Sequence, residues 1–351
     1  MAARARVRQA IQAGISRQVS PKSLTPDDRG ESAMIILGND KYIEARFRDE
    51  QEIEDVVLAN SEHFFGPSSL LIPKRRIATK DGTGTIPDAF AVDLASCVWY
   101  VVEAELSQHN VWTHIAPQVT KQLLAANQPE TRQLLTEIIV QMYDADAEVK
   151  DKFSDEGIRE IDIRKVLGEV FGQSPIIGMP IDRVPDDLRE WGETLRNDVR
   201  LWTVKKYVQL GTPGNVAYEI PEEYRPTVDT SGRDGAMQSR RAYDVSLTDL
   251  LRARLVAEGD ELTMAYAPRG AKRKTFRATV NEDGTLEVLG EVYSSLSYAA
   301  LACIQSVGSE RTTVNGWSQW RLHGKTLADI RQDYLRLLDT DQNDPTGSSD
   351  D

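Results

Sequence analysis

The sequence predicts an α/β protein built from two modules, and three observations support this prediction. Short apolar runs typical of strands alternate with helical periodicity through residues 45–220. Residues 221–244 are rich in Pro, Gly, Ser, Asp and Arg, a composition typical of a linker. Short strand-like segments and three helical segments then follow. The 351 residues, of which 40% are apolar, are enough for two hydrophobic cores.

The first module is expected to hold a mixed sheet flanked by helices. Residues 1–44 predict a short helix and a loop, and an amphipathic helix over residues 49–65 ends at Gly66. Residues 80–84 have the composition of a hairpin turn. The remaining strands are expected at residues 70–72, 86–94, 98–106, 175–181 and 199–210, and the remaining helices at 112–126, 128–151 and 185–197.

The second module, residues 245–338, is expected to be a small α+β domain. Ser246 followed by Asp249 is typical of a capped helix start. Residues 339–351 contain five Asp and no basic residue, which predicts a disordered acidic tail. Strands are expected at residues 262–266, 274–280 and 285–289, and further helices at 297–307 and 327–338.

The charge and the apolar runs exclude several classes of protein. A formal net charge of −13 argues against a protein that coats nucleic acid without specificity. The chain has no run of 18 apolar residues, and its basic N-terminus lacks the apolar core of a secretory signal. Cys97 and Cys303 lie in apolar stretches, as reduced core thiols do. We therefore expect a cytoplasmic protein with no membrane partner.

Three carboxylates in residues 85–122 carry the chemistry that the sequence suggests. Glu103 and Glu105 are two residues apart on an apolar strand, so their side chains share one face. Side by side and buried, they repel each other unless a cation lies between them. If Asp88 lies on the neighbouring strand, three carboxylates converge, and such oxygen ligands suit Mg²⁺ or Mn²⁺.

Pro87-Asp88, a hydrophobic strand and Glu103-Ala104-Glu105 resemble the PD-(D/E)xK restriction-endonuclease-like superfamily. The resemblance covers roughly residues 45–215 and implies a mixed sheet flanked by helices, with Asp88, Glu103 and Glu105 as catalytic metal ligands. Glu105 replaces the usual lysine that orients the attacking water. The resemblance further implies roles for side chains on the flanking helices, namely Glu54 or Glu52 as an auxiliary metal ligand and Gln118 and Lys121 as residues that help to orient water or phosphate.

Alternatives to this interpretation remain open. A Pro-Asp pair is common at turns, and Glu103 and Glu105 could form an exposed strand face that pairs with Arg. Such a fold can also lose its chemistry and persist as a binding domain. The four histidines are scattered without zinc-ligand spacing, so no zinc site is expected from them; His109 and His114 are expected near the site entrance or in solvent.

The C-terminal module resembles the RAMA domain through a small-residue helix followed by the motif NGWxxW at residues 315–320. The resemblance implies DNA binding, with sensing of a modified base or positioning of DNA. Basic side chains could contact phosphates, and the two tryptophans could stack on a base or pack in the core. The candidate DNA-binding residues are Lys272, Arg273, Lys274, Arg277, Asn315, Trp317 and Trp320, with Arg269, Arg240-Arg241 and Lys74-Arg75-Arg76 as further phosphate contacts.

Together, these features predict a Mg²⁺- or Mn²⁺-dependent DNA endonuclease of a restriction or defence system, in which the C-terminal module selects DNA, modified or not. The expected partner is double-stranded DNA, and cutting both strands favours a homodimer. A nuclease acting in repair would share this chemistry. The alternative is a non-catalytic DNA-binding or regulatory protein with a decayed nuclease fold. The absence of a lysine at position 105 supports this alternative.

Overall fold

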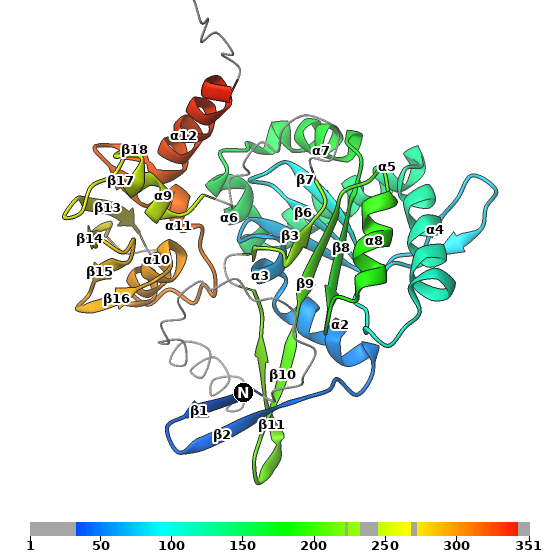
Figure 1. The fold of residues 1–351 in the computed structure, drawn as a ribbon. Helices are drawn as coiled ribbons and strands as arrows, with labels where there is room; N and C mark the ends of the chain where they lie inside the picture. Colours follow the sequence, from blue (N-terminus) through cyan, green and yellow to red (C-terminus); the bar gives the residue numbers. More distant parts are fainter. Residues whose placement is uncertain (1–32, 222–223, 232–244, 268–271, 343–351) are drawn as a thin grey trace, which may run out of the picture. The chain divides into compact units, whose positions relative to one another are not determined.

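The computed structural model describes residues 33–221, 224–231, 245–267 and 272–342 of the chain, with side chains to residue 338. The chain divides into two compact units, residues 1–230 and 231–351, which are described separately (Figure 1). The predicted helix near the N-terminus, Arg240-Arg241 and Arg269 lie outside the described residues. No helix in the described ranges is long and apolar enough to cross a membrane.

A six-stranded mixed sheet forms the centre of the first unit. Its order is β12-β9-β8-β7-β6-β3; β3, β6 and β7 are antiparallel, β7, β8 and β9 are parallel, and β12 pairs antiparallel with β9. All six residues of β8 are buried, as expected for a central parallel strand. The strands are β3 (Ser69–Pro73), β6 (Ala89–Asp93), β7 (Val98–Val102), β8 (Ile176–Ile181), β9 (Val199–Thr203) and β12 (Val228–Asp229).

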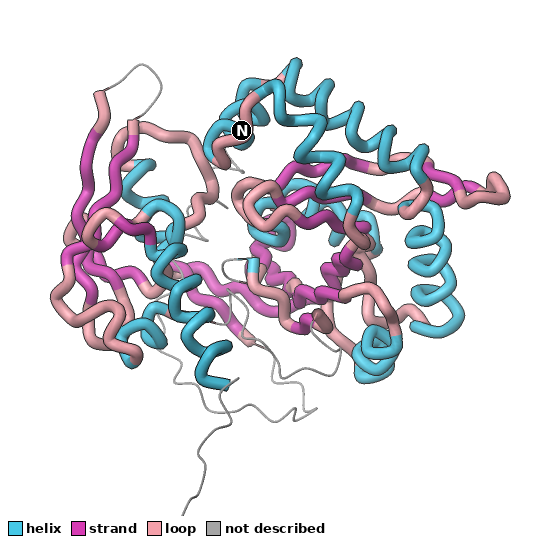
Figure 2. The backbone as a smooth tube through the Cα atoms, turned by 90° about the horizontal axis from the view of Figure 1, so that it is seen from above, coloured by secondary structure: helices cyan, strands magenta, loops and turns pink. Residues whose placement is uncertain are grey.

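Helices flank this sheet because its side chains alternate between two apolar faces (Figure 2). On one face, Val101 and Ile177 belong to clusters that include residues of α4, α5, α7 and α8; on the other, Tyr100 and Ala91 pack with α2 and α3. The sequence prediction missed α7. The helices are α2 (Glu50–Ala59), α3 (Ser61–Phe65), α4 (Ala116–Ala126), α5 (Pro129–Ala145), α6 (Ala147–Asp155), α7 (Ile163–Gly172) and α8 (Asp186–Thr194).

A second sheet of order β1-β2-β10-β11 corrects two predictions. Residues 34–45, expected in a loop, form β1 (Met34–Leu37) and β2 (Asp40–Ala45) around Gly38, whose φ is 60°. The single strand expected at 199–210 is two strands, because the chain passes at Val204 from β9 to β10 (Lys205–Gln209), which pairs with β2 and β11 (Thr212–Glu219). The apolar run Met34–Leu37 is a strand signal that the sequence prediction overlooked.

The 221–244 segment is not a linker throughout. Val228 and Asp229 form β12 and pair with Leu201 and Arg200 of β9, so the first unit extends to Thr230. This pairing explains the buried Thr230 hydroxyl, which accepts the Val199 N–H at 2.7 Å.

The second unit is a six-stranded sheet with helices, and its predicted strands and helices are confirmed. The sheet has the order β16-β15-β14-β13-β17-β18. Ser246 caps α9 in a capping box with Asp249. Helix α12 continues to residue 342, into the segment expected to be a disordered tail. The elements are α9 (Leu247–Arg252), β13 (Glu261–Tyr266), β14 (Lys274–Val280), β15 (Leu286–Val288), β16 (Glu291–Tyr293), α10 (Leu296–Gln305), α11 (Gly316–Gln319), β17 (Arg321–Leu322), β18 (Lys325–Thr326) and α12 (Leu327–Gln342). The whole chain is therefore a mixed α/β protein, as predicted.

Candidate active site

Asp88 and Glu103 lie at the same end of the antiparallel pair β6–β7. Asp88 directly precedes β6 and Glu103 directly follows β7, where Ala89 is paired with Val102. The Asp88 carboxylate accepts the backbone N–H of Ala104 at 3.0 Å, which fixes it across the pair. The two carboxylates are therefore brought together, as the sequence predicted.

The predicted strand 98–106 ends earlier than expected, since β7 stops at Val102. The backbone nevertheless remains paired with β8, because the N–H groups of Glu103 and Glu105 donate to Gly178 and Pro180, each at 3.0 Å. This extended backbone preserves the two-residue alternation, and both residues are buried, at 3% and 1% exposure of the whole residue.

Two glutamines of α4 hold the Glu103 carboxylate. Gln118, which the sequence analysis named, donates to one oxygen, and Gln122 donates to the other at 2.6 Å. Burial, followed by the neighbouring charge of Asp88, raises the pKa of Glu103 well above its usual value. Gln122 was missed, although its position one helical turn after Gln118 places both on one face.

A lysine that the sequence analysis did not place in the site bridges Asp88 and Glu54. The Lys74 ammonium is 2.7 Å from Glu54 and 3.5 Å from Asp88. Burial raises the pKa of Asp88, while the hydrogen bond to Glu54 raises the pKa of Lys74. Of the two glutamates proposed in α2, Glu54 lies here, whereas Glu52 pairs with Lys206 at 2.6 Å.

The Glu105 carboxylate faces histidines rather than Asp88. Its oxygen is 3.0 Å from Nδ1 of His109, and the same nitrogen is 2.7 Å from an oxygen of Glu50. The His114 ring lies 4.7 Å from the His109 ring, centroid to centroid. Burial raises the pKa of Glu105 to about 7, and Glu50 contributes to this shift. The two histidines thus lie beside Glu105, which is the first of the two positions that the sequence analysis expected for them, although their spacing gave no sign of a shared contact.

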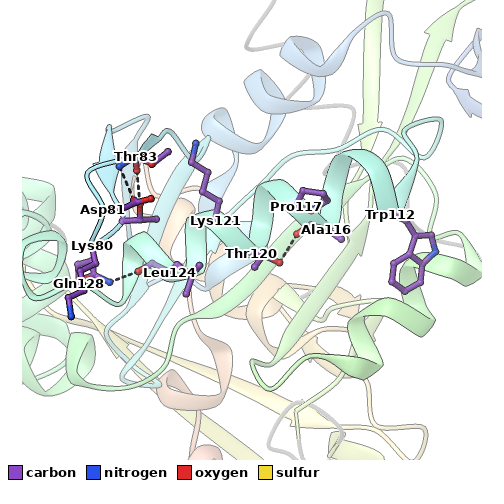
Figure 3. A pocket seen from close by; sticks show the side chains of 11 residues that line it. Lys80, Asp81, Thr83, Trp112, Ala116, Pro117, Thr120, Lys121, Leu124 and Gln128 are labelled. Carbon is purple, nitrogen blue, oxygen red and sulfur yellow. Dashed lines mark hydrogen bonds between the residues drawn. The ribbon is translucent and has the colours of Figure 1, made fainter.

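Lys121 does not join Gln118 at the Glu103 carboxylate. It lines a surface cavity of about 710 Å³ between α4 and the 79–83 turn, with Trp112 at the other end (Figure 3). Gln122 rather than Lys121 reaches Glu103 from the next turn of α4. The helix geometry explains this difference, because Gln118 and Gln122 are separated by four residues along one face.

Both tryptophans of the NGWxxW motif pack in the core, which corrects their assignment to DNA contacts. Trp320 is fully buried and donates its indole N–H to the Leu296 carbonyl at 3.0 Å. Trp317 is 5% exposed, and the Arg331 guanidinium lies 4.1 Å from its ring centroid. Asn315 caps α11 by accepting the Trp317 N–H at 3.1 Å. The motif therefore stabilises the fold of this unit.

The basic residues at the start of β14 are exposed, as a phosphate-binding surface requires. Lys272, Arg273 and Lys274 are exposed, and the Lys274 ammonium lies 4.9 Å from the Phe276 ring centroid. Arg277 pairs with Glu261 on β13 at 2.5 Å, so its charge is partly neutralised. Lys272, Arg273 and Lys274 are therefore the strongest candidates among these residues for contacts with DNA.

The chain thus combines a mixed α/β unit that buries a group of carboxylates with a small α+β unit that exposes basic residues. Residues 227–339 match the RAMA family, described as Restriction Enzyme Adenine Methylase Associated. The match confirms the resemblance of the C-terminal module and associates it with restriction-modification systems. It covers less than half of the chain and does not extend over the carboxylates. Among curated proteins, none matches this chain.

Proposed function

We propose that the chain is a metal-dependent DNA endonuclease of a restriction or defence system. The observation that carries the proposal is the carboxylate pair of half-buried Asp88 and buried Glu103, which backbone and glutamine donors hold at the end of β6–β7. Burying two neighbouring carboxylates costs free energy that a folded protein recovers when they bind a cation. The match of the second unit to a restriction-associated family supports a role in defence.

The arrangement of the first unit supports a restriction-endonuclease-like core. The antiparallel strands β3, β6 and β7 are followed by the parallel strands β8 and β9, with helices on both faces. The sequence resemblance places the superfamily's acidic metal ligands at Asp88 and Glu103, which lie at the same end of β6 and β7. We propose this fold from the topology together with these two positions.

The residues fit a divalent cation of the Mg²⁺ or Mn²⁺ type. Asp88, Glu103 and Glu54 offer carboxylate oxygens, which such hard cations prefer. The buried Oε1 of Gln122 has no hydrogen-bond partner among the described residues, so it is available to a water at this site. A bound cation would lower the pKa of a water and stabilise charge at the scissile phosphate.

Lys74 takes the place of the lysine that the motif lacks. Glu105 occupies the usual lysine position, but the ammonium of Lys74 lies beside Asp88 and Glu54. Since its side chain is 48% exposed, Lys74 can also reach a phosphate oxygen or orient a water at the site. We therefore propose Lys74, rather than Lys121, as the basic residue of the reaction. Gln118 and Gln122 position Glu103.

The second unit would select the DNA. We propose that Lys272, Arg273 and Lys274 contact phosphates of double-stranded DNA, and that the unit distinguishes modified from unmodified substrate. Cleavage of both strands by one active site per chain would require two copies on the duplex, so a homodimer belongs to this proposal.

The test is cleavage of modified and unmodified plasmid and phage DNA in Mg²⁺ or Mn²⁺. Wild-type protein should cut, and Glu103→Gln, which keeps the shape but removes the charge, should not. Glu130→Gln, at an exposed position of α5, is the matched control and should cut as wild type does. Absence of cutting on every DNA, together with tight DNA binding that persists in EDTA, would instead establish a non-catalytic binding protein.

A further inference from the structure

We propose that Glu50, Glu105, His109 and His114 form a binding site for a transition-metal ion. One ligand atom from each of the four side chains lies within 4.8 Å of the other three. The set brings two imidazoles and two carboxylates together, unlike the all-oxygen group around Asp88. This site goes beyond the proposed nuclease function and shares only Glu105 with the predicted catalytic residues.

The donor types select the class of metal. Imidazole nitrogen suits Zn²⁺, Cu²⁺, Fe²⁺ and Ni²⁺, whereas Mg²⁺ and Mn²⁺ suit oxygen ligands. Around a tetrahedral zinc, with metal–ligand distances of about 2.1 Å, donors lie about 3.4 Å apart. The separations of the ligand atoms lie around this value. They are 2.7 Å between His109 and Glu50, 3.0 Å between His109 and Glu105, and 4.0 Å between His114 and Glu50.

Hydrogen bonding alone leaves this group incompletely satisfied. One nitrogen, Nδ1 of His109, faces carboxylate oxygens of both Glu50 and Glu105. That nitrogen carries at most one proton, so it donates fully to only one of them. The two carboxylates meanwhile repel each other, and Glu105 has 2% of its side chain exposed to water. A divalent cation would neutralise both.

The fold builds the group from three separate segments. Glu50 is the first residue of α2, and Glu105 continues the pairing of β7 with β8 through its bridge to Ile181. His109 precedes a π-helical turn over Val111–Ile115, and His114 lies within that turn. The fold brings the two imidazole rings to 4.7 Å from each other, centroid to centroid.

The exposure of the four side chains leaves a path for the ion. Glu105 anchors the buried end, while Glu50 and His114 are 44% and 47% exposed at the outer end. The exposed pair can adjust on binding, because neither packs in the core. His109, 27% exposed, lies between the two ends.

The experiment uses the full chain stripped with EDTA and titrated with Co²⁺, whose visible absorption reports its ligands. Wild type should bind Co²⁺ at a site from which Zn²⁺ displaces it and excess Mg²⁺ does not. The single variants His109→Ala and His114→Ala should each weaken this binding by about 10-fold or more, and the double variant should abolish it. Circular dichroism checks that these variants remain folded.

Two further variants separate this site from the nuclease proposal. His323→Asn removes an exposed imidazole of the second unit and should bind Co²⁺ as wild type does. Asp88→Asn should abolish DNA cleavage yet retain the histidine-dependent Co²⁺ absorption. Equal Co²⁺ binding by wild type and the double histidine variant, or no Co²⁺ binding by wild type, would overturn the site. Loss of DNA cleavage activity in every assay would not contradict the proposed transition-metal site.

Discussion

The two units of the chain use charge in opposite ways. Among the described residues, the buried charged side chains all belong to the first unit: Glu54, Asp93, Glu103 and Glu105. In the second unit, the buried polar residue is Ser295, and the basic residues of β14 face solvent. Burying charge destabilises a fold unless partners or ions compensate, whereas exposed charge costs little. This contrast supports our proposal that the first unit carries the chemistry and the second unit the recognition of DNA.

The largest effect that would test this contrast is expected at Lys74. Lys74→Met removes the ammonium beside Asp88 and Glu54 while keeping the length of the side chain. We expect DNA cleavage to fall by roughly 100- to 1000-fold, with DNA affinity changed much less. Lys80→Met, at an exposed position of the hairpin turn, is the control. Equal loss in both variants would mean that Lys74 acts through general electrostatics.

A smaller but still large effect on stability is expected at Gly316. A Cβ atom there would lie 2.2 Å from the backbone carbon of Leu296, so Gly316→Ala forces α10 and α11 apart. We expect the second unit to lose about 3 kcal/mol of stability, measured by thermal unfolding, and selection of modified DNA to be lost with it. Gly168→Ala, with nothing near its Cβ position in the exposed interior of α7, should not lower stability and should raise it slightly. A stable Gly316→Ala protein would contradict this packing.

The third test concerns the free-energy cost of buried charge in the first unit. Because the pKa of Glu105 is raised to about 7, the folded protein binds more protons than the unfolded chain between about pH 4.5 and 7. Stability in EDTA should therefore fall as pH rises through this window, and Glu105→Gln should remove roughly 1–3 kcal/mol of that fall. Hydrogen exchange of β7 amides at pH 5 and pH 8 measures it. An unchanged pH dependence in Glu105→Gln, as expected for Glu130→Gln, would refute the assignment.

The smallest effect is expected on the exposed surface of the second unit. The double variant Lys272→Ala and Arg273→Ala should weaken DNA binding by about 3- to 10-fold at low salt. It should also reduce the slope of log affinity against log salt by about 2. Fluorescence anisotropy over a salt series measures both quantities. Lys325→Ala, an exposed lysine paired with Asp333, is the control. An unchanged slope would move the DNA-binding surface away from β14.

Much of this protein could be predicted from local sequence alone. Short continuous apolar runs predicted the central strands, and Ser246 with Asp249 indicated the start of α9. The two-residue alternation of a strand placed Glu103 and Glu105 on one side of an extended backbone. These features depend on neighbours within a few residues, where strand and helix geometry determines which side chains share a face.

Only the tertiary structure decided which partners surround those carboxylates. Lys74 reaches Asp88 and Glu54 from the end of β3, and Glu50 meets His109 across almost 60 residues of sequence. The burial of Trp320 likewise depends on its bond to Leu296, far along the chain. Such contacts follow from how sheets and helices pack, and one sequence carries no local pattern for them. The sequence shows which residue types are present, whereas packing decides which charged side chains lie close enough to neutralise one another.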